Sequence, residues 1–385
     1  MDQRLEDARA AVQRRMPELW SLVQAWVEIE SFTADHAGCE RMVTALLDAF
    51  ALPGFAPRRV PGDGAAGHVV ATTPAFAAQG GTLLVGHHDT VFPPGTFVGF
   101  RRDETKAYGP GVLDMKGGLA IIRTALAALS DLGLLARLPL AFVSVSDEEI
   151  GSVDGRRVIE ELARGAAGGL VFEAGRMNDA IVTQRKGTGK LKVTARGKAA
   201  HAGNDLASGI NAIWVLARFI DGVQRLSEGG TTVNVGLVRG GTSANTVPAE
   251  AVCEIDLRVV RGGDAERLLV AADQLARQLA DETGAKLTLE GGIRRQPLER
   301  LPGTPAILER YAAAARAEGL GGDEAALMGG GSDANTLAAI GVPAIDGLGP
   351  RGRGFHTHDE FAELATFEPR VMALVRYLLG LAPAA

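Results

Sequence analysis

Three apolar runs of this chain each end in residues that can bind a metal or move a proton. Residues 82–85 are followed by Gly-His-His-Asp, residues 138–146 by Asp-Glu-Glu, and residues 169–172 by Glu173. Short runs rich in leucine and β-branched residues predict buried strands of a parallel sheet. Because open α/β sheets bind ligands at the carboxyl ends of their strands, one edge of this sheet would collect these polar side chains.

The first of these strands delivers His87 and Asp89, two residues apart. Side chains at positions i and i+2 of a strand point to the same side. His87 can therefore bind a metal through one ring nitrogen while Asp89 reaches the other nitrogen and orients the ring. An isolated H-x-D is also typical of an ordinary polar strand end, so the interpretation depends on the other motifs.

Asp114 lies in a glycine-rich turn at 108–118, ahead of a helix predicted over 119–132. Glycines around an acidic residue indicate a sharp turn where the backbone passes close to another group. The alternative is a helix cap, a role that aspartate often fills. A cap adjoins its helix, however, whereas Gly117 and Gly118 separate Asp114 from this one. We therefore predict a site residue.

The acidic run at 147–149 follows the second strand with no basic residue within several positions. An isolated run of this kind is commonly a solvated loop, but carboxylates at a buried strand end repel one another unless a cation lies among them. Five nitrogen and oxygen ligands are then available, without a thiolate: His87, Asp114, Glu149, Glu173 and His356. Five ligands suit two cations that share a carboxylate, and this chemistry favours two zinc ions, with cobalt or manganese as replacements. Glu148 is the candidate general base, or otherwise a second acid beside the ligands.

Length and composition predict two domains. The chain has 385 residues, which is long for a single core. We predict an α/β catalytic domain over 1–185 and 296–385, with a mixed, largely parallel sheet and flanking helices. Its first helical region, over 3–29, would be broken at Pro17. The inserted domain, 186–295, follows the β-α-β-β-α-β order of a ferredoxin-like α+β fold.

The same composition argues against several classes of partner. The net charge of −6 gives no sign of a nucleic-acid or membrane-surface partner, and two cysteines make no disulfide framework. Apolar runs of about 20 residues and a signal-peptide core are absent from the sequence, so a cytoplasmic protein is expected. The glycines at 329–331 lack the spacing and the lysine of a phosphate-binding loop, and the spacing of a dinucleotide-binding fold is also missing.

These motifs resemble the co-catalytic zinc aminoacylase/carboxypeptidase family, which includes glutamate carboxypeptidases, acetylornithine deacetylases, succinyl-diaminopimelate desuccinylases and peptidase T. The resemblance covers nearly the whole chain and is strongest at 86–91, 109–118, 147–152, 172–173, 197–203, 329–333 and 356–360. It implies that His87 and Glu173 hold one zinc, Glu149 and His356 the other, and that Asp114 bridges them. It also implies that Asp89 orients His87, and that Glu148 acts as the base and then as the acid for the leaving amine.

The resemblance gives the inserted domain the role of a lid or dimerisation domain in a homodimer. His201 matches a histidine that reaches the partner subunit's active site and steadies the oxyanion; by itself it would be a surface turn residue. Asn245 and Arg258 match positions that grip the free carboxylate of a small or short-peptide substrate, which an arginine binds bidentately. By itself Arg258 would be a surface arginine on a strand. Arg294, just before the chain returns to the catalytic domain, is a weaker candidate of the same kind, and Gly331 would offer backbone near the substrate.

Gly-Pro-Gly at 109–111 and Phe172-Glu173 are most similar to the glutamate carboxypeptidase branch, which releases C-terminal glutamate from folate-like or peptidic acyl groups. The first alternative function is an N-acyl-amino-acid deacylase of the acetylornithine deacetylase or aminoacylase type. The second alternative is a non-catalytic metal- or carboxylate-binding relative. The presence of Glu148 together with Asp89 argues against the non-catalytic relative. His358 competes with His356 as a ligand, but the His-x-x-x-Glu spacing of the family, which ends at Glu360, favours His356.

Overall fold

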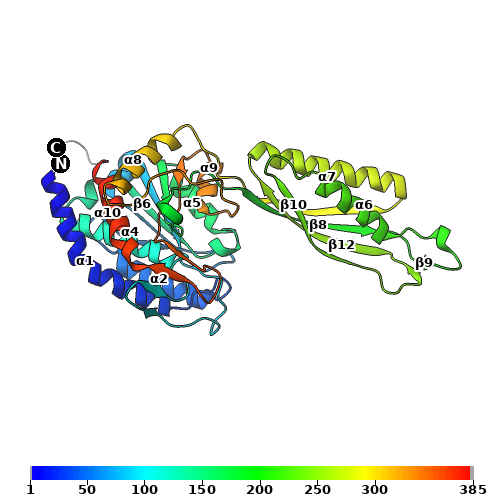
Figure 1. Ribbon diagram of the computed structural model, residues 1–385, viewed down its shortest axis with the longest axis horizontal. Coiled ribbons are helices and arrows are strands. Elements are labelled where there is room, and N and C mark those ends of the chain that lie inside the picture. Colours follow the sequence, from blue (N-terminus) through cyan, green and yellow to red (C-terminus); the bar gives the residue numbers. More distant parts are fainter. Residues whose placement is uncertain (1, 382–385) are drawn as a thin grey trace. The chain divides into compact units, whose positions relative to one another are not determined.

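The computed structural model describes residues 2–381, and its chain divides into two compact units, each with its own core (Figure 1). The first unit takes the chain up to Gln184, Arg300–Leu327, and the chain from Ser332 onward. The inserted unit takes Arg185–Glu299 and Met328–Gly331. The predicted domain bounds and the lid or dimerisation role of the insertion stay predictions.

The first unit is built on a six-stranded sheet in the order β1-β2-β6-β3-β7-β14. The strands are β1 (Arg58–Val60), β2 (His68–Thr72), β3 (Gly81–His87), β6 (Leu140–Val145), β7 (Ala166–Val171) and β14 (Ala344–Ile345). β3 pairs in parallel with both β6 and β7, and β14 pairs in parallel with β7, whereas β1 and β2 are antiparallel. The prediction of a mixed, largely parallel sheet is confirmed.

The helices of this unit are α1 (Asp2–Glu28), α2 (His36–Phe50), α3 (Pro74–Gln79), α4 (Lys116–Asp131), α5 (Gly155–Ala163), α8 (Thr304–Arg316), α9 (Asp333–Ala339) and α10 (Phe367–Leu379). Apolar residues of α1, α2, α4, α8 and α10 form one core with the sheet. The rings of Phe50 in α2 and Phe142 in β6 stack at 4.2 Å. This core fixes the central strands, whose carboxyl ends carry the predicted ligands.

The predicted break of the first helix at Pro17 is wrong, because α1 runs through it without interruption. Proline costs a helix interior about 3 kcal/mol. On either side of Pro17 the helix buries an apolar face that includes Val12, Leu19, Val23 and Trp26. Burying one such side chain contributes about 1.5–3 kcal/mol, so the packing outweighs the proline.

The predicted start of the helix that follows Asp114 is also wrong, since α4 begins at Lys116 rather than at 119. Gly117 and Gly118 therefore lie in its first turn. A Cβ on Gly117 would come within 2.4 Å of the Val112 carbonyl oxygen, and one on Gly118 within 2.2 Å of the Phe172 carbonyl oxygen. These glycines allow the helix to pack closely against its neighbours. They do not separate Asp114 from the helix, but the N-cap position is Met115, one residue after Asp114, and it makes no side-chain cap hydrogen bond.

A small second sheet, in the order β15-β16-β5-β4, joins two distant parts of the first unit. Its strands are β4 (Arg101–Arg102), β5 (Lys106–Tyr108), β15 (Gly352–Arg353) and β16 (Phe361–Glu363). β15 and β16 form a hairpin whose turn, 354–360, contains His356. β16 also pairs with β5, which leads directly into the loop of Asp114.

The inserted unit has a four-stranded antiparallel sheet in the order β10-β12-β8-β13. The strands are β8 (Gly187–Arg196), β10 (Thr232–Gly240), β12 (Glu250–Val259) and β13 (Lys286–Arg295), and a short pair joins β9 (Ala200–His201) with β11 (Thr246–Val247). The helices α6 (Ala212–Gln224) and α7 (Gly262–Thr283) share a core with this sheet. The predicted ferredoxin-like order is confirmed.

Within residues 2–381 the structure has no helix that is both long and apolar enough to cross a membrane. The cytoplasmic location and the lack of a nucleic-acid partner stay predictions.

Candidate active site

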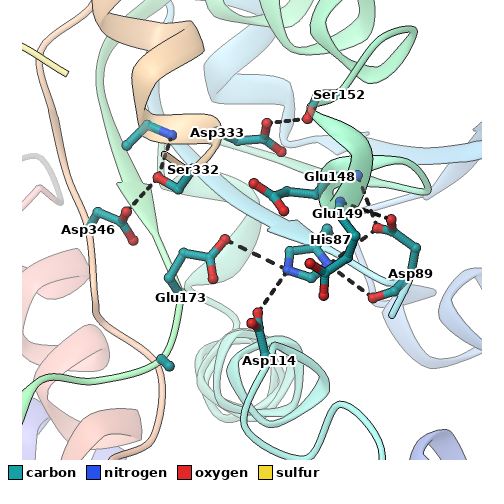
Figure 2. A network of polar contacts seen from close by, with 12 residues as sticks. His87, Asp89, Asp114, Glu148, Glu149, Ser152, Glu173, Ser332, Asp333 and Asp346 are labelled. Atoms are coloured by element: carbon teal, nitrogen blue, oxygen red, sulfur yellow. Dashed lines mark hydrogen bonds and ion pairs between the residues drawn. The ribbon is translucent and has the colours of Figure 1, made fainter. Parts of the chain in front are cut away.

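The strand ends of the first unit turn a histidine and several carboxylates toward one another, as Figure 2 shows. His87 is fully buried at the end of β3, and its Nε2 lies 3.1 Å from Oδ1 of Asp114 and 3.7 Å from Oε1 of Glu173. Its other nitrogen, Nδ1, lies 3.1 Å from the carbonyl oxygen of Asp89 and 3.3 Å from Oδ1 of the same residue. This arrangement favours a proton on Nδ1 and leaves Nε2 facing the carboxylates.

The two oxygens of the Asp114 carboxylate face two different histidines. Oδ1 lies toward His87, and Oδ2 lies 3.3 Å from Nε2 of His356. The same Nε2 is 3.1 Å from Oε2 of Glu149. Asp114 therefore stands between two groups of donors.

The remaining predicted ligands lie close to the same point. One donor atom each from His87, Glu148 and Glu173 lies within 4.8 Å of the others, and the same holds for His87, Asp114 and Glu149. The structure thus brings together all five predicted metal ligands and the predicted base.

His356 and His358 differ clearly in their surroundings. His356 has a left-handed backbone (φ 64°) and turns its half-exposed ring toward the carboxylates. The ring of His358 instead lies 6.1 Å from that of Phe92 and 5.4 Å from that of Phe97. The geometry therefore favours His356 as the donor.

Asp89 lies fully buried beneath the site and contacts more than His87. Its carboxylate accepts the backbone N–H groups of Glu148 (3.2 Å) and Glu149 (3.1 Å), and the hydroxyl of Thr33 (2.7 Å). Asp89 therefore positions the loop of both glutamates. Thr33 lies 56 residues before Asp89, and no motif around it indicates this contact.

Asp147, the first residue of the acidic run, has a different role from the two that follow. Its carboxylate accepts the backbone N–H of Asp154 (2.7 Å) and of Gly155 (3.1 Å) at the start of α5. The favourable interaction of a carboxylate with a helix N-terminus explains its burial without a cation. Of the acidic run at 147–149, Asp147 therefore binds the start of α5 and only Glu148 and Glu149 belong to the donor cluster.

Glu360 is buried and accepts three backbone hydrogen bonds from the loop that carries Asp114. The donors are the N–H groups of Gly111 (3.0 Å), Leu113 (2.8 Å) and Asp114 itself (3.0 Å). In the sequence, Glu360 served only as the end of the His-x-x-x-Glu spacing that favours His356 over His358. Its long-range hydrogen bonds have no local sequence signal.

The electrostatics of the cluster fit a bound cation. Burial, together with the charge of Asp114, raises the pKa of Glu149 to about 8 and raises that of Glu173 well above its usual value. Hydrogen bonds to Asp114 and Glu149 raise the pKa of His356 to about 10. These groups can share the site only by keeping protons that a cation would replace. Imidazole and carboxylate donors suit zinc, so the residues present fit a divalent metal centre.

The substrate-binding candidates lie in the inserted unit. Residue His201 pairs with Thr246 across β9 and β11, and the N–H of Ala202 donates to the carbonyl oxygen of Asn245 at 3.0 Å, so His201 and Asn245 lie in neighbouring segments. The exposed ring of His201 accepts, through Nδ1, the N–H groups of Gly203 and Asn204. Their catalytic and binding roles stay predictions.

Arg258 in β12 makes a two-pronged contact with Asp256, at 2.9 and 3.2 Å, and its Nη1 lies 3.4 Å from the carbonyl oxygen of Gly329. Gly331 ends the same short segment, Met328–Gly331. Arg294 is exposed near the end of β13. Their contacts with a substrate also stay predictions.

The sequence model of Peptidase family M20/M25/M40 matches residues 83–380. The chain belongs to this family. The predicted family-level resemblance is therefore confirmed, and this M20 protein is a hydrolase that acts on amide bonds.

Two curated relatives have similar identities and different activities. Carboxypeptidase G2 of Pseudomonas sp. (strain RS-16) is 29% identical over 308 residues, which cover 78% of this chain and 73% of the relative. Succinyl-diaminopimelate desuccinylase of Delftia acidovorans is 28% identical over 384 residues, which cover 92% of this chain and 95% of the relative. Among solved structures, aminopeptidase PepT of Bacillus cereus aligns with a TM-score of 0.77 and 23% identity over 94% of this chain and 98% of that chain, a likeness in fold.

Proposed function

We propose that this M20 hydrolase uses two zinc ions and releases C-terminal glutamate from folate-like or peptidic N-acyl groups. The observation that supports two ions is the position of Asp114, whose two carboxylate oxygens lie 3.1 and 3.3 Å from the Nε2 atoms of His87 and His356. A carboxylate between two such donor groups suits two metals about 3.5–4 Å apart.

The residues would divide between the ions as follows. His87 and Glu173 would hold one ion, Glu149 and His356 the other, and Asp114 both, while Asp89 keeps the ring of His87 in place. Two bound divalent cations would polarise the scissile carbonyl and acidify the attacking water. This donor set also accepts cobalt or manganese.

Glu148 would carry the proton. Its carboxylate lies within 4.8 Å of donor atoms of His87 and Glu173, and its backbone is held by Asp89. It would take a proton from the water whose oxygen adds to the carbonyl carbon, and give that proton to the nitrogen as the C–N bond breaks. His201 would steady the charge on the carbonyl oxygen.

The inserted unit would bind the free carboxylate of the substrate through Arg258 and Asn245, with help from Arg294 and from the backbone of Gly331. A guanidinium binds a carboxylate bidentately, as Arg258 already does with Asp256. The similarity to carboxypeptidase G2 and the Gly-Pro-Gly motif support release of glutamate.

A second candidate function is N-acyl-amino-acid deacylation. It is favoured by the desuccinylase relative, which matches 92% of this chain against 78% for carboxypeptidase G2. The two functions share the metal chemistry and differ in the groups that flank the amide bond.

A cytoplasmic homodimer through the inserted unit belongs to the same proposal. Its support is apolar exposure on α6 and on the edge strand β10, at Ile213 (43%), Trp214 (54%), Leu237 (49%) and Val238 (56%). Leu237 and Val238 are consecutive in β10 and therefore face opposite sides of the sheet, and an edge strand with exposed apolar side chains favours pairing with another chain. A solution mass of twice the monomer would support the dimer, and a monomer mass at micromolar concentration would contradict it.

The test of function is a matched substrate panel with zinc-loaded protein, with chelated protein, and with chelated protein reloaded with zinc. The panel contains aroyl- and peptidyl-glutamates, the same acyl groups on aspartate and on an amino acid amide, and N-acetyl and N-succinyl amino acids. Released amine is measured directly. Zinc-dependent release of glutamate, lost when the carboxylate is amidated, is the expected result.

Zinc-dependent turnover of N-acetyl or N-succinyl substrates alone would keep the metal chemistry and reject the glutamate branch. Turnover that survives complete chelation would reject the metal mechanism. Two bound zinc ions without turnover of any substrate would favour the non-catalytic relative.

A further inference from the structure

The loop that carries Asp114 is fixed by a single side chain that comes from a distant part of the chain. Glu360 directs Oε1 at the N–H groups of Leu113 and Asp114 and Oε2 at the N–H of Gly111, at 2.8–3.0 Å. The three donors lie 246 to 249 residues away in sequence, and Glu360 is fully buried. One of these bonds reaches the backbone of the proposed bridging residue itself.

The same side chain stands four residues after His356. β15 and β16 form the hairpin whose turn contains His356, and Glu360 immediately precedes β16. β16 pairs with β5, residue Phe361 opposite Tyr108, so that the strand following Glu360 lies beside the strand leading into the Asp114 loop. Glu360 thus connects, at one point, the two segments that supply Asp114 and His356.

A carboxylate suits this position better than any neutral side chain. Three backbone donors converge on it, and an ionised carboxylate offers only acceptors. Gln would have to turn its amide nitrogen toward at least one N–H group. Asp would keep the charge but would be one methylene too short to maintain all three contacts.

We propose that Glu360 is a positioning residue for the metal centre, which sets the separation of Asp114 and His356 through the backbone of residues 111–114. The inference rests on the proposed function, because it assigns these two residues to a shared metal. Groups that orient metal ligands from behind affect metal affinity by about 10- to 100-fold when they are changed.

The test compares Glu360→Gln and Glu360→Asp with wild type and with Glu363→Gln. Glu363 is a suitable control because it ends β16, the strand that follows Glu360, and its carboxylate accepts a hydrogen bond from Arg351 at 2.8 Å rather than from the Asp114 loop. Zinc is titrated calorimetrically into each metal-free protein. Thermal unfolding is then recorded with and without zinc, so that a loss of fold is separated from a loss of metal binding.

Wild type and Glu363→Gln should bind two zinc ions with equal affinity, while both Glu360 variants lose about 10- to 100-fold in affinity for at least one ion. Their zinc-induced rise in melting temperature should shrink by more than their metal-free melting temperature falls. A loss of zinc affinity in Glu360→Gln but not in Glu360→Asp would indicate that only the charge matters, and would overturn the positioning role. So would a lower metal-free melting temperature with an unchanged zinc-induced rise, the signature of a structural role.

The failures of the two proposals are distinguishable. Wild type that binds fewer than two zinc ions would overturn the dinuclear site and this inference with it. Wild type that binds two, with both Glu360 variants matching it in affinity, would overturn this inference alone.

Discussion

Replacing Thr33 by valine removes one hydroxyl beneath the site, which lies beside Asp89 and, at 3.4 Å, the carbonyl oxygen of Thr90. The Thr33 hydroxyl donates to Oδ2 of Asp89 at 2.7 Å, and both residues are buried. Valine has nearly the same shape, so the substitution removes the donor and leaves the packing. Hydrogen bonds to a charged group contribute about 1.5–3 kcal/mol, and we expect Thr33→Val to lower the free energy of unfolding of the first unit by that amount.

The pH dependence gives this prediction a second check. Burial alone raises the pKa of the Asp89 carboxyl, but the hydrogen bond and charge of His87 and the hydroxyl of Thr33 lower it below its usual value. A lowered pKa stabilises the fold above the pKa of the unfolded state, about 3.9, and this contribution is lost as the pH falls further. The difference between wild type and Thr33→Val should therefore be constant from about pH 8 to pH 5 and shrink below about pH 4.

Urea unfolding of metal-free protein, followed by tryptophan fluorescence, measures this difference. Trp20 and Trp26 lie in the first unit and Trp214 in the inserted one, so a Trp214→Phe background reports on the first unit alone. Thr44→Val is the control, because this exposed threonine donates only within α2, and it should change stability by less than about 0.5 kcal/mol. A loss no larger than that of the control, or one that grows toward acid pH, would refute the reasoning.

Three further predictions concern the metal and the substrate. His356→Ala should remove one of two zinc ions by metal analysis, whereas His358→Ala should keep both, because its ring packs among phenylalanines. Metal-free protein should lose stability as pH rises from 6.5 to about 10, because hydrogen bonds to Asp114 and Glu149 raise the pKa of His356 to about 10; denaturation curves across this range, with and without zinc, measure the loss. Arg258→Ala should raise KM for substrates with a free carboxylate about tenfold, with little change in kcat, in steady-state assays.

The sequence identifies the donors that follow strands, because these depend on local pattern. An apolar run that becomes a buried parallel strand places its next residues at the sheet edge, and β3 and β7 do this for His87 and Glu173. Glu149 follows β6 in the same way. The placement of these three donors at one sheet edge, and the order of the main elements, could thus be predicted from residue types and hydrophobic periods.

Other features depend on tertiary contacts that leave no local pattern. Glu360 and Thr33 hold Asp114 and Asp89 across 246 and 56 residues of chain, and nothing in their neighbours indicates this. Pro17 misled the prediction of α1 because local propensity ignores the core against which a helix packs. The position of His356 follows from a hairpin of two short strands, which periodicity does not detect.

A substitution of Glu148 distinguishes an enzyme from a non-catalytic metal-binding relative. The charge of Glu148 predicts the effect of that substitution on zinc affinity. After burial and the charge of Asp114, the charge of Glu148 further raises the pKa of both Glu149 and Glu173, and so opposes ionisation of two proposed ligands. Glu148→Gln should therefore leave zinc affinity unchanged or higher. It should still lower kcat by about 10²- to 10⁴-fold, because the base is lost.

Zinc titration and steady-state rates for Glu148→Gln, beside Glu161→Gln on the exposed side of α5, separate the interpretations. Zinc affinity that falls as far as in His356→Ala would make Glu148 a ligand, and an unchanged kcat would place the base elsewhere. A metal centre without catalysis gains nothing from a carboxylate that weakens its own ligands. Full metal binding combined with lost turnover is therefore the result that only a hydrolase with Glu148 as its base explains.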